Sequence, residues 1–350
     1  MSDPSHSQLT KKIGFADHIG GLRSVRDQFH DYMLQFLPLQ PAEPLNEQIN
    51  DTHDAIIRKA IMLSEMELAR QGMDSPPVPY AYLLFGSGGR KEQTLSSDQD
   101  SGLVYRDPER GREGETKQYF LRLSACIVQN LIEAGYPPCE GSVLSSNPEW
   151  CHSLSEWGEK LEGWFKEPTW EAVRYLLILA DGRSVFGDEG LLDAIQDMFY
   201  TDTLNHPVIL SRMMDNTMRH KVLVGVFGQL LKERYGQDAG SLDIKYGAYI
   251  PMVNSIRLMA IHSNIRTTST LGRLRKLVEI GKLTEEEGKS YEQAFRFILR
   301  LRLMTTEHMT DNVYGNNGKL PGSKLTKEMA DELKSSLRQG KRLQRSVFRI

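Results

Sequence analysis

The chain has 350 residues, of which 39% are hydrophobic and 25% are charged, and its net charge is −3. This composition is ordinary for a globular protein, and the length allows two or three domains that each bury a core. The small negative charge argues against a general nucleic-acid binder, which usually has a strongly basic face. The three cysteines, Cys126, Cys139 and Cys151, are odd in number and irregularly spaced, so neither a disulfide framework nor a zinc site is indicated.

The N-terminal residues lack the apolar segment of a signal peptide, and no apolar run is long enough to span a bilayer. We therefore expect a cytoplasmic protein with no membrane partner. Its function must be inferred from local motifs.

Residues 1–50 are predicted to form a helical arm, because apolar side chains recur at helical spacing between Phe29 and Leu37. Prolines at 38, 41 and 44 are expected to end this arm. Residues 51–71 have the pattern of an amphipathic helix that Asp51 or Thr52 caps. A proline-rich connector follows at 76–79.

The periodicity then changes to that of a small sheet. Residues 80–85 (YAYLLF) and 101–105 (SGLVY) are apolar runs of strand length, and residues 141–145 are a candidate third strand. Residues 116–134 have the pattern of an amphipathic helix. From residue 154 onward the predicted helices cover 154–165, 169–180, 191–199, 208–235, 246–262, 271–280, 284–307 and 327–347.

The sequence thus predicts an α+β fold that is mostly helical. We expect the helical arm at 1–50, an α/β catalytic domain at 51–150 and a helical domain at 151–350. A sheet of three strands cannot enclose a substrate by itself, so the helical domain is expected to supply the opposite wall.

Gly86 and Ser87 stand where the first predicted strand ends and a helix is expected to begin. Glycine lets the backbone approach a ligand closely, and the N–H groups at a helix start attract anions. A serine in this position can donate a hydrogen bond to a phosphate oxygen. Taken alone, however, the sequence 86–89 (GSGG) favours a flexible turn.

Asp98 and Asp100 flank Gln99 at the start of the second predicted strand. Alternation along a strand places both carboxylates on one face and Gln99 on the other. Two such carboxylates repel each other unless a cation lies between them, and Mg²⁺ is the usual cation in phosphate chemistry. Two Mg²⁺ ions can activate an attacking oxygen and neutralise a leaving pyrophosphate. In isolation an Asp-x-Asp sequence favours a capping or turn pair.

The two motifs together are more specific than either alone. A strand that ends in Gly-Ser, followed by Asp-x-Asp entering the next strand, describes a phosphate-binding turn that faces a metal site. Arg90 and Lys91 lie between the motifs and are candidates to hold triphosphate oxygens. Glu92 and Gln93 are candidates to orient Arg90 or to contact the base or ribose.

The segment 86–105 (GSGGRKEQTLSSDQDSGLVY) resembles the signature GSxxRxEQxxxxDQDxxL of a bacterial nucleotidyltransferase family of the DUF294 type. That family is related to the N-terminal catalytic domain of protein-PII uridylyltransferase, within the polymerase-β superfamily. The resemblance continues at 135–164, 180–191, 242–260 and 271–277, and it covers residues from roughly 50 to 350.

The resemblance implies a small polymerase-β-like sheet with flanking helices, followed by a helical bundle. It implies that Gly86 and Ser87 bind phosphate. It also implies that Asp98 and Asp100 are the catalytic carboxylates, which hold two Mg²⁺ ions.

The resemblance further places Arg90, Glu92 and Gln93 in the same nucleotide-binding cleft. In the helical part, Asp243 and Lys245 match a DxK element whose lysine is thought to reach the triphosphate in related uridylyl- and adenylyltransferases. A solvated loop lysine is an equally supported interpretation of Lys245.

Active members of the superfamily usually add a third carboxylate from a later strand. The candidates here are Glu140, before the candidate third strand, and Asp181. Asp181, with Arg183 and Asp188, has more the pattern of a structural polar cluster between helices. Without a third acid, general-base activation of the nucleophile is weaker.

The leading hypothesis is a Mg²⁺-dependent nucleotidyltransferase that moves a nucleoside monophosphate from UTP or ATP to a hydroxyl, such as a tyrosine of a regulatory protein like PII. The expected partners are a nucleoside triphosphate and this protein acceptor. The alternatives are a nucleotide-binding regulatory module that has lost catalysis, and nucleotidyl transfer to a small molecule.

Overall fold

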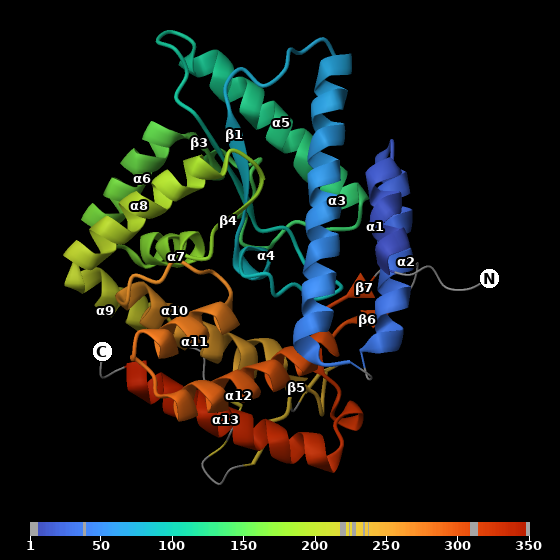
Figure 1. Ribbon diagram of the computed structural model, residues 1–350, viewed down its shortest axis with the longest axis vertical. Helices are drawn as coiled ribbons and strands as arrows, with labels where there is room; N and C mark the ends of the chain where they lie inside the picture. Colours follow the sequence, from blue (N-terminus) through green and yellow to red (C-terminus); the bar gives the residue numbers. More distant parts are fainter. Residues whose placement is uncertain are drawn as a thin grey trace. The chain divides into compact units, whose positions relative to one another are not determined.

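The two apolar runs predicted as strands form the centre of a four-stranded sheet with the order β3-β2-β1-β4 (Figure 1). In the computed structural model, β1 (Tyr80–Leu84) pairs antiparallel with β2 (Ser101–Tyr105) on one side and with β4 (Arg183–Gly187) on the other. The edge strand β3 (Cys151–Ser153) runs parallel to β2. The structure describes residues 6–37, 40–217, 222–308 apart from 224, 226–228, 234 and 237, and 314–347.

Helices cover both faces of this sheet, which explains why every residue of β1 and β2 is buried and why the strands read as continuous apolar runs. On one face Tyr105 stacks on Phe120 of α5, with ring centroids 4.5 Å apart. On the other face Trp157 of α6 donates its indole N–H to the carbonyl of Leu103, at 3.2 Å. Figure 1 shows α3 and α5 on one side of the sheet and α6 and α8 on the other. The helices of this part are α1 (His6–Phe15), α2 (Ile19–Phe36), α3 (Ala42–Arg70), α4 (Gly86–Gly89), α5 (Glu113–Glu133), η1 (Pro148–Trp150), α6 (Leu154–Lys166) and α8 (Glu189–Asn205).

The chain divides into two compact units. The sheet unit comprises residues 1–39, 44–166 and 181–199, and the helical unit comprises residues 40–43, 167–180 and 200–350. This division differs from the domains expected at 1–50, 51–150 and 151–350. The arm helices belong to the sheet unit, and so do residues 151–166 and 181–199, because they include β3 and β4.

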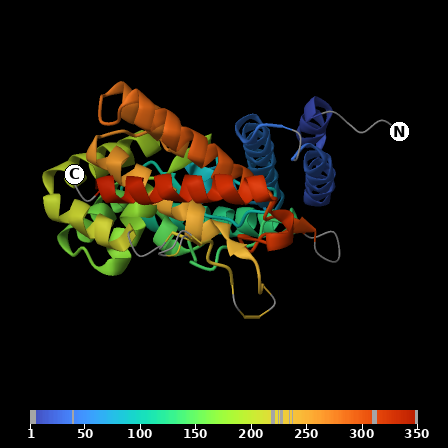
Figure 2. The same ribbon diagram turned by 90° about the horizontal axis from the view of Figure 1, so that it is seen from below.

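The helical unit is built around α10, whose residues from Pro251 to Ile261 are all buried. The helix is mostly apolar, and its buried Arg257 donates to the Leu177 carbonyl at 3.1 Å and to Asn254 at 2.7 Å. α12 and α13 lie side by side, and α13 also packs on α10 (Figure 2). The elements of this unit are α7 (Trp170–Leu179), α9 (Pro207–Thr217), β5 (Leu242–Asp243), η2 (Lys245–Tyr249), α10 (Ile250–His262), α11 (Thr270–Glu279), α12 (Glu285–Leu303), β6 (Glu307–His308), β7 (Tyr314–Gly315), β8 (Lys319–Leu320), η4 (Gly322–Lys324) and α13 (Lys327–Val347).

The predicted fold class, α+β and mostly helical, is confirmed. Among the described residues, no helix combines the length and the apolar character needed to cross a membrane.

The prediction of a third strand at 141–145 is wrong. Ser142 has a φ of +54°, which breaks the extended conformation, and the N–H of Val143 donates to the Cys139 sulfur at 3.1 Å. The segment instead touches the start of β2 through a hydrogen bond from Ser101 N–H to the Val143 carbonyl, at 3.0 Å. The third and fourth strands are 151–153 and 183–187, which lie between the predicted helices of the region expected to be a helical domain.

Two helix boundaries also differ from the prediction. α3 begins at Ala42 rather than at residue 51, because Pro44 falls within its first turn, where proline is tolerated. The helix predicted at 208–235 ends at Thr217. Beyond it, the described residues of 222–233 are not helical, and residues 218–221, 224, 226–228 and 234 of the predicted helix lie outside the described residues.

Candidate functional site

The backbone at the end of β1 bends into the single helical turn α4, which contains Gly86 and Ser87. Gly86 has a φ of +54°, in the left-handed region that side chains disfavour. The N–H of Phe85 donates to the carbonyl of Asp100 at 2.9 Å, so the turn is tied to the residue that precedes β2. Ser87 is half-buried, and its carbonyl accepts the N–H of Glu92 at 2.8 Å. The Gly-Ser turn therefore stands beside the Asp-x-Asp motif.

The Asp100 carboxylate lies directly against Gly86. A Cβ at residue 86 would overlap Asp100 Oδ2 and would lie 3.3 Å from its Cγ. A Cβ here would displace the carboxylate from this position, so glycine permits its close approach to the turn.

Asp98 and Asp100 point away from the core, whereas Gln99 points into it. Asp98 is exposed and Asp100 is half-buried. The buried Gln99 amide donates to the carbonyls of Val128 and Tyr136, at 3.2 Å and 2.8 Å. Both acids and Gln99 line one cavity of about 20 Å³, the size of about one water molecule, together with Gly88 and Gln93.

Arg90 lies next to the turn but is occupied by buried acids. Its exposed fraction is 5%, its Nε donates to Glu92 at 2.9 Å and its Nη1 donates to Asp181 at 2.5 Å. Such a buried, doubly paired guanidinium is held in place by its partners. Arg90 is not among the residues that line the cavity, and its contact with Glu92 is one of the two roles that the sequence left open for Glu92.

Gln93 is the other motif residue that reaches the cavity. Its backbone is held by α3, where Asn50 accepts its N–H at 3.1 Å and Asn46 donates to its carbonyl at 3.0 Å. Its side chain is 3% exposed, and the buried Oε1 has no hydrogen-bond partner among the described residues. Buried polar atoms are normally satisfied, so this atom is suited to a ligand that donates a hydrogen bond.

Lys91 is exposed and lies 3.6 Å from a carboxylate oxygen of Asp51 and 4.0 Å from one of Asp54. Its φ of +55° is unusual for a residue other than glycine. These contacts place Lys91 on the α3 side of the turn.

The structure separates the two candidates for a third carboxylate. Asp181 is fully buried and paired with Arg90, so it belongs to a structural cluster. The other two residues of the expected cluster have different partners. Arg183 pairs with Asp54 at 2.8 Å, and Asp188 pairs with Arg106 at 3.2 Å. Glu140 is exposed. Within the part of the chain that the structure describes, no group of three His, Cys, Asp or Glu side chains is arranged to hold a metal ion.

Cys139 is a neighbour of the acid pair that the sequence analysis had not assigned to the site. Burial and the nearby Asp100 carboxylate raise the pKa of the Cys139 thiol to about 12, and Asp98 acts in the same direction. A thiol with this pKa stays protonated at neutral pH and is a poor ligand for a hard cation. The sequence offered no signal for this contact, because Cys139 lies outside both motifs.

Two comparisons with known families agree with this geometry. Residues 30–171 match the family model Putative nucleotidyltransferase DUF294, and residues 207–349 match the companion model Putative nucleotidyltransferase substrate binding domain. The chain belongs to the DUF294 nucleotidyltransferase family. No curated protein shows a significant match to the chain.

The first DUF294 segment contains the Gly-Ser turn and both acids, and these residues suit a bound Mg²⁺ ion. Two carboxylates that share one side supply hard oxygen donors, and glycine at 86 removes the Cβ that would occupy the space beside Asp100. Mg²⁺ commonly binds one or two carboxylates and takes its other ligands from water and substrate phosphates. The acid pair therefore fits a metal that arrives with a triphosphate.

The substrate-binding segment of this DUF294 protein contains Lys245, which begins the π-helical turn η2. Its N–H donates to the Gly318 carbonyl at 3.0 Å, and its ammonium lies 5.2 Å from the ring centroid of Tyr246. Asp243 is occupied locally, because its Oδ1 accepts the N–H of Tyr246 at 2.8 Å. Single π-helical turns are frequent at functional sites, which makes Lys245 a candidate within its own unit.

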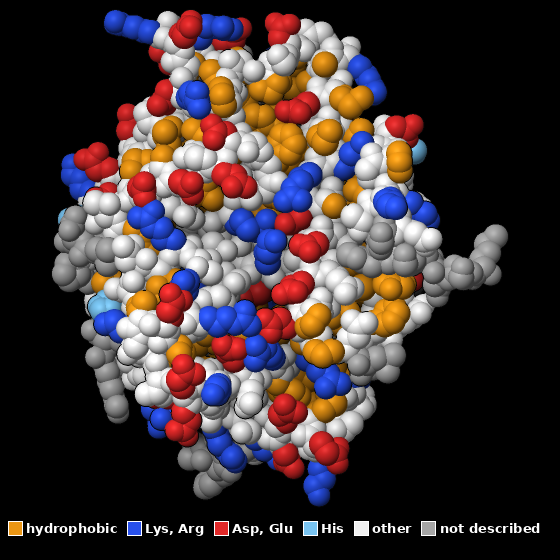
Figure 3. All heavy atoms as spheres, in the orientation of Figure 1, with side chains coloured by type: hydrophobic (Ala, Val, Ile, Leu, Met, Phe, Trp, Pro, Cys, Tyr) orange, Lys and Arg blue, Asp and Glu red, His pale blue; other side chains and the backbone are white. Residues whose placement is uncertain are grey.

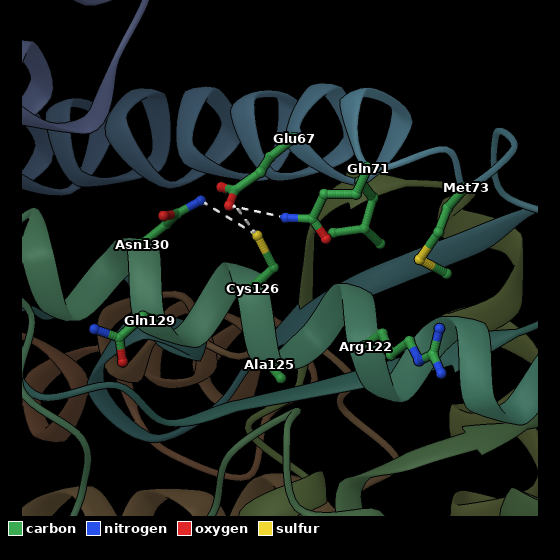
Figure 4. A pocket seen from close by; sticks show the side chains of 9 residues that line it. Glu67, Gln71, Met73, Arg122, Ala125, Cys126, Gln129 and Asn130 are labelled. Atoms are coloured by element: carbon green, nitrogen blue, oxygen red, sulfur yellow. Dashed lines mark hydrogen bonds between the residues drawn. The ribbon is translucent and has the colours of Figure 1, made fainter.

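The sheet unit also has a groove of about 470 Å³ between α3 and α5, away from the predicted site residues. Figure 3 shows hydrophobic side chains gathered on the part of the surface where these two helices run. In the groove Glu67 accepts hydrogen bonds from Gln71 and Cys126, at 3.3 Å and 3.4 Å (Figure 4). Burial raises the pKa of Cys126 to about 11, so this thiol is also protonated at neutral pH. The groove contains none of the residues that match the nucleotidyltransferase motif.

Proposed function

We propose that the protein transfers a nucleoside monophosphate from UTP or ATP to a hydroxyl group, with Asp98 and Asp100 as the catalytic carboxylates. The observation that carries this proposal is the Asp100 carboxylate lying against Gly86, with Asp98 in the same cavity. Membership of a nucleotidyltransferase family supports the reaction class.

In this reaction the acceptor oxygen forms a bond to the α-phosphorus and the bond to pyrophosphate breaks. The acceptor hydroxyl loses its proton, and with no third carboxylate among the described residues that line the cavity, either Asp98, Asp100 or solvent takes it. Mg²⁺ held by these two residues would supply positive charge for the triphosphate and the leaving pyrophosphate. Ser87 would donate a hydrogen bond to a phosphate oxygen, and Gln93 would accept one from the ribose or base.

The proposed acceptor is a tyrosine hydroxyl of a regulatory protein. This choice is supported by the relation of the DUF294-type family, whose signature residues 86–105 resemble, to protein-PII uridylyltransferase. Lys245 is then the proposed triphosphate contact from the helical unit. A small molecule remains the alternative acceptor, because the second matched segment is described only as a substrate binding domain.

The test is incubation of the wild-type protein with labelled UTP or ATP, Mg²⁺ and candidate acceptors. Pyrophosphate release should require Mg²⁺, and Asp98→Asn and Asp100→Asn should each reduce it by at least about a hundredfold, as expected when a group that stabilises the transition state is lost. Arg106→Ala removes a charge just after the end of β2, outside the cavity, and should leave the rate unchanged. Equal rates in the wild type and the Asp98→Asn/Asp100→Asn double variant would overturn the proposal.

A specific observation favours a second function, that of a nucleotide-binding regulatory module without catalysis. Asp181 is committed to Arg90, Glu140 does not line the cavity with Asp98 and Asp100, and the described residues include no three-ligand cluster for a metal. Calorimetry distinguishes the two functions. Nucleotide binding in the low micromolar range without pyrophosphate release in the presence of any acceptor would favour the regulatory module.

A further inference from the structure

Three contacts connect the segment 181–183 to the Gly-Ser turn, although these parts are far apart in the sequence. The backbone carbonyl of Asp181 packs so closely on Gly89 that any Cβ at residue 89 would overlap it. The Asp181 carboxylate accepts a hydrogen bond from Arg90 at 2.5 Å. The first two contacts therefore hold the C-terminal end of the turn.

Arg183 provides the third contact and fixes one peptide group of the turn. Its Nη2 donates to the Gly88 carbonyl at 2.9 Å, while the N–H of Gly89 donates to the Phe85 carbonyl at 2.8 Å. The peptide group is planar, so holding its oxygen and its N–H fixes the orientation of the whole 88–89 unit.

Arg183 is itself held by Asp54 of α3. Nη1 and Nη2 donate to the two carboxylate oxygens of Asp54 at 2.9 Å and 2.8 Å, and Asp54 is only 2% exposed. This two-pronged geometry matches the planar guanidinium fork and leaves little freedom at the arginine head. The contacts thus run from α3 through Arg183 to the backbone of the turn.

We propose that Asp54, Asp181 and Arg183 are positioning residues that preorganise the Gly-Ser turn for a nucleoside triphosphate. This inference rests on the proposed function. A turn with three glycines has a large conformational entropy, and a turn ordered before binding loses less on meeting the ligand. Asp181 and Arg183 lie between the two matched family segments, which end at 171 and resume at 207.

The experiment compares Arg183→Met with Arg106→Met in the full-length protein. Arg106 also pairs with an aspartate in the sheet unit, since its Nη2 lies 3.2 Å from Asp188 Oδ2, and neither residue lines the cavity. Arg183→Lys and Asp54→Asn serve as milder variants, because Lys keeps the charge without the fork and Asn keeps the shape without the charge. Only variants with a cooperative thermal transition enter the comparison.

Hydrogen exchange in the absence of nucleotide tests whether Arg183 orders the Gly-Ser turn. The amides of Gly89, Arg90 and Glu92 should exchange at least tenfold faster in Arg183→Met than in the wild type, with helix α12 of the helical unit unchanged. Arg106→Met should match the wild type. Exchange in Arg183→Met that equals exchange in Arg106→Met would overturn the inference, whatever the enzyme does.

Nucleotide binding tests the functional part. With Mg²⁺ and a non-hydrolysable UTP or ATP analogue, Arg183→Met should weaken binding at least tenfold, and in turnover the effect should appear mainly in KM, with Arg183→Lys intermediate. A purely structural role would lower the melting temperature and the active fraction and leave Kd unchanged, and that result would overturn positioning. If the wild type binds neither analogue, the proposed function and the nucleotide part of this inference both fail. Faster exchange in Arg183→Met would still establish that Arg183 orders the turn.

Discussion

At the scale of single residues, the site depends on glycine at position 86. Gly86 combines a left-handed φ of +54° with direct contact to Asp100, so two separate physical constraints select glycine. Gly72 meets only the first constraint, because its φ is +82° and no atom lies within 4 Å of its Cβ position. Alanine substitutions at the two glycines therefore distinguish the effect of backbone strain from the effect of displacing the Asp100 carboxylate.

Gly86→Ala is expected to abolish nucleotidyl transfer, because the new Cβ would displace the Asp100 carboxylate. The left-handed backbone should also cost about 1–2 kcal/mol of unfolding free energy. Pyrophosphate release and urea unfolding measure the two effects.

Gly72→Ala is the matched control for this change. It should lose a similar unfolding free energy, about 1–2 kcal/mol, and keep its activity. If Gly86→Ala retained wild-type activity, the contact between residue 86 and Asp100 would have no catalytic importance.

At the scale of secondary-structure elements, α6 supports the strand that follows the acid pair. Trp157 is fully buried, packs against Trp150 and Trp164, and donates to the carbonyl of Leu103 in β2. The spacing of these tryptophans by seven residues in the sequence thus corresponds to a packing cluster of the sheet unit.

Trp157→Phe should lower the unfolding free energy by about 1–3 kcal/mol, since it removes the indole hydrogen bond to a buried carbonyl and removes ring volume. Urea unfolding followed by circular dichroism measures this loss. Trp170→Phe is the comparison, because Trp170 is 45% exposed, and it should change the unfolding free energy by less than about 1 kcal/mol. Equal losses in the two variants would contradict the role assigned to the Leu103 contact.

At the scale of the whole molecule, stability should depend on pH because burial lowers the pKa of His30, His53 and His152. His53 donates through Nε2 to the Thr94 carbonyl at 3.0 Å, so its Nδ1 accepts from the Tyr136 hydroxyl at 2.7 Å. Burial lowers the pKa of His53 to about 3. Burial and the neighbouring Lys117 charge lower the pKa of His152 to about 4.

These pKa values predict that acid destabilises the sheet unit. The unfolded chain has an ordinary histidine pKa near 6.5, so below this pH protons bind the unfolded state preferentially. The loss of stability begins as the pH falls through about 6.5 and continues down to the folded-state pKa. Between pH 8 and pH 5, each histidine should remove about 2 kcal/mol of unfolding free energy.

Urea unfolding at the two pH values tests this expectation. His152→Gln cannot bind the proton, so it should reduce the difference between pH 8 and pH 5 by about 2 kcal/mol, whatever its own effect on stability at pH 8. An unchanged difference would show that His152 does not provide this acid sensitivity.

The sequence alone determined the central strands and the local geometry of the motif. β1 and β2 were predicted because an apolar run of strand length and the glycine that ends it are local features of the sequence. Asp98 and Asp100 were expected on one side of the chain because alternation is a short-range property of extended backbone. The resemblance of the motif to a nucleotidyltransferase family was confirmed by the family models.

Only the tertiary structure decided which motif residues face the cavity and which strands complete the sheet. Arg90 pairs with Asp181, 91 residues away in the sequence, and Arg183 pairs with Asp54, 129 residues away. No local sequence pattern predicts pairs at such separations. The strands β3 and β4 are short and lie next to helices, so their pairing with β2 and β1 was invisible in the sequence. Long-range pairing depends on how the whole chain buries its polar and apolar groups together, and this decided that Arg90 supports the turn while Gln93 reaches the cavity.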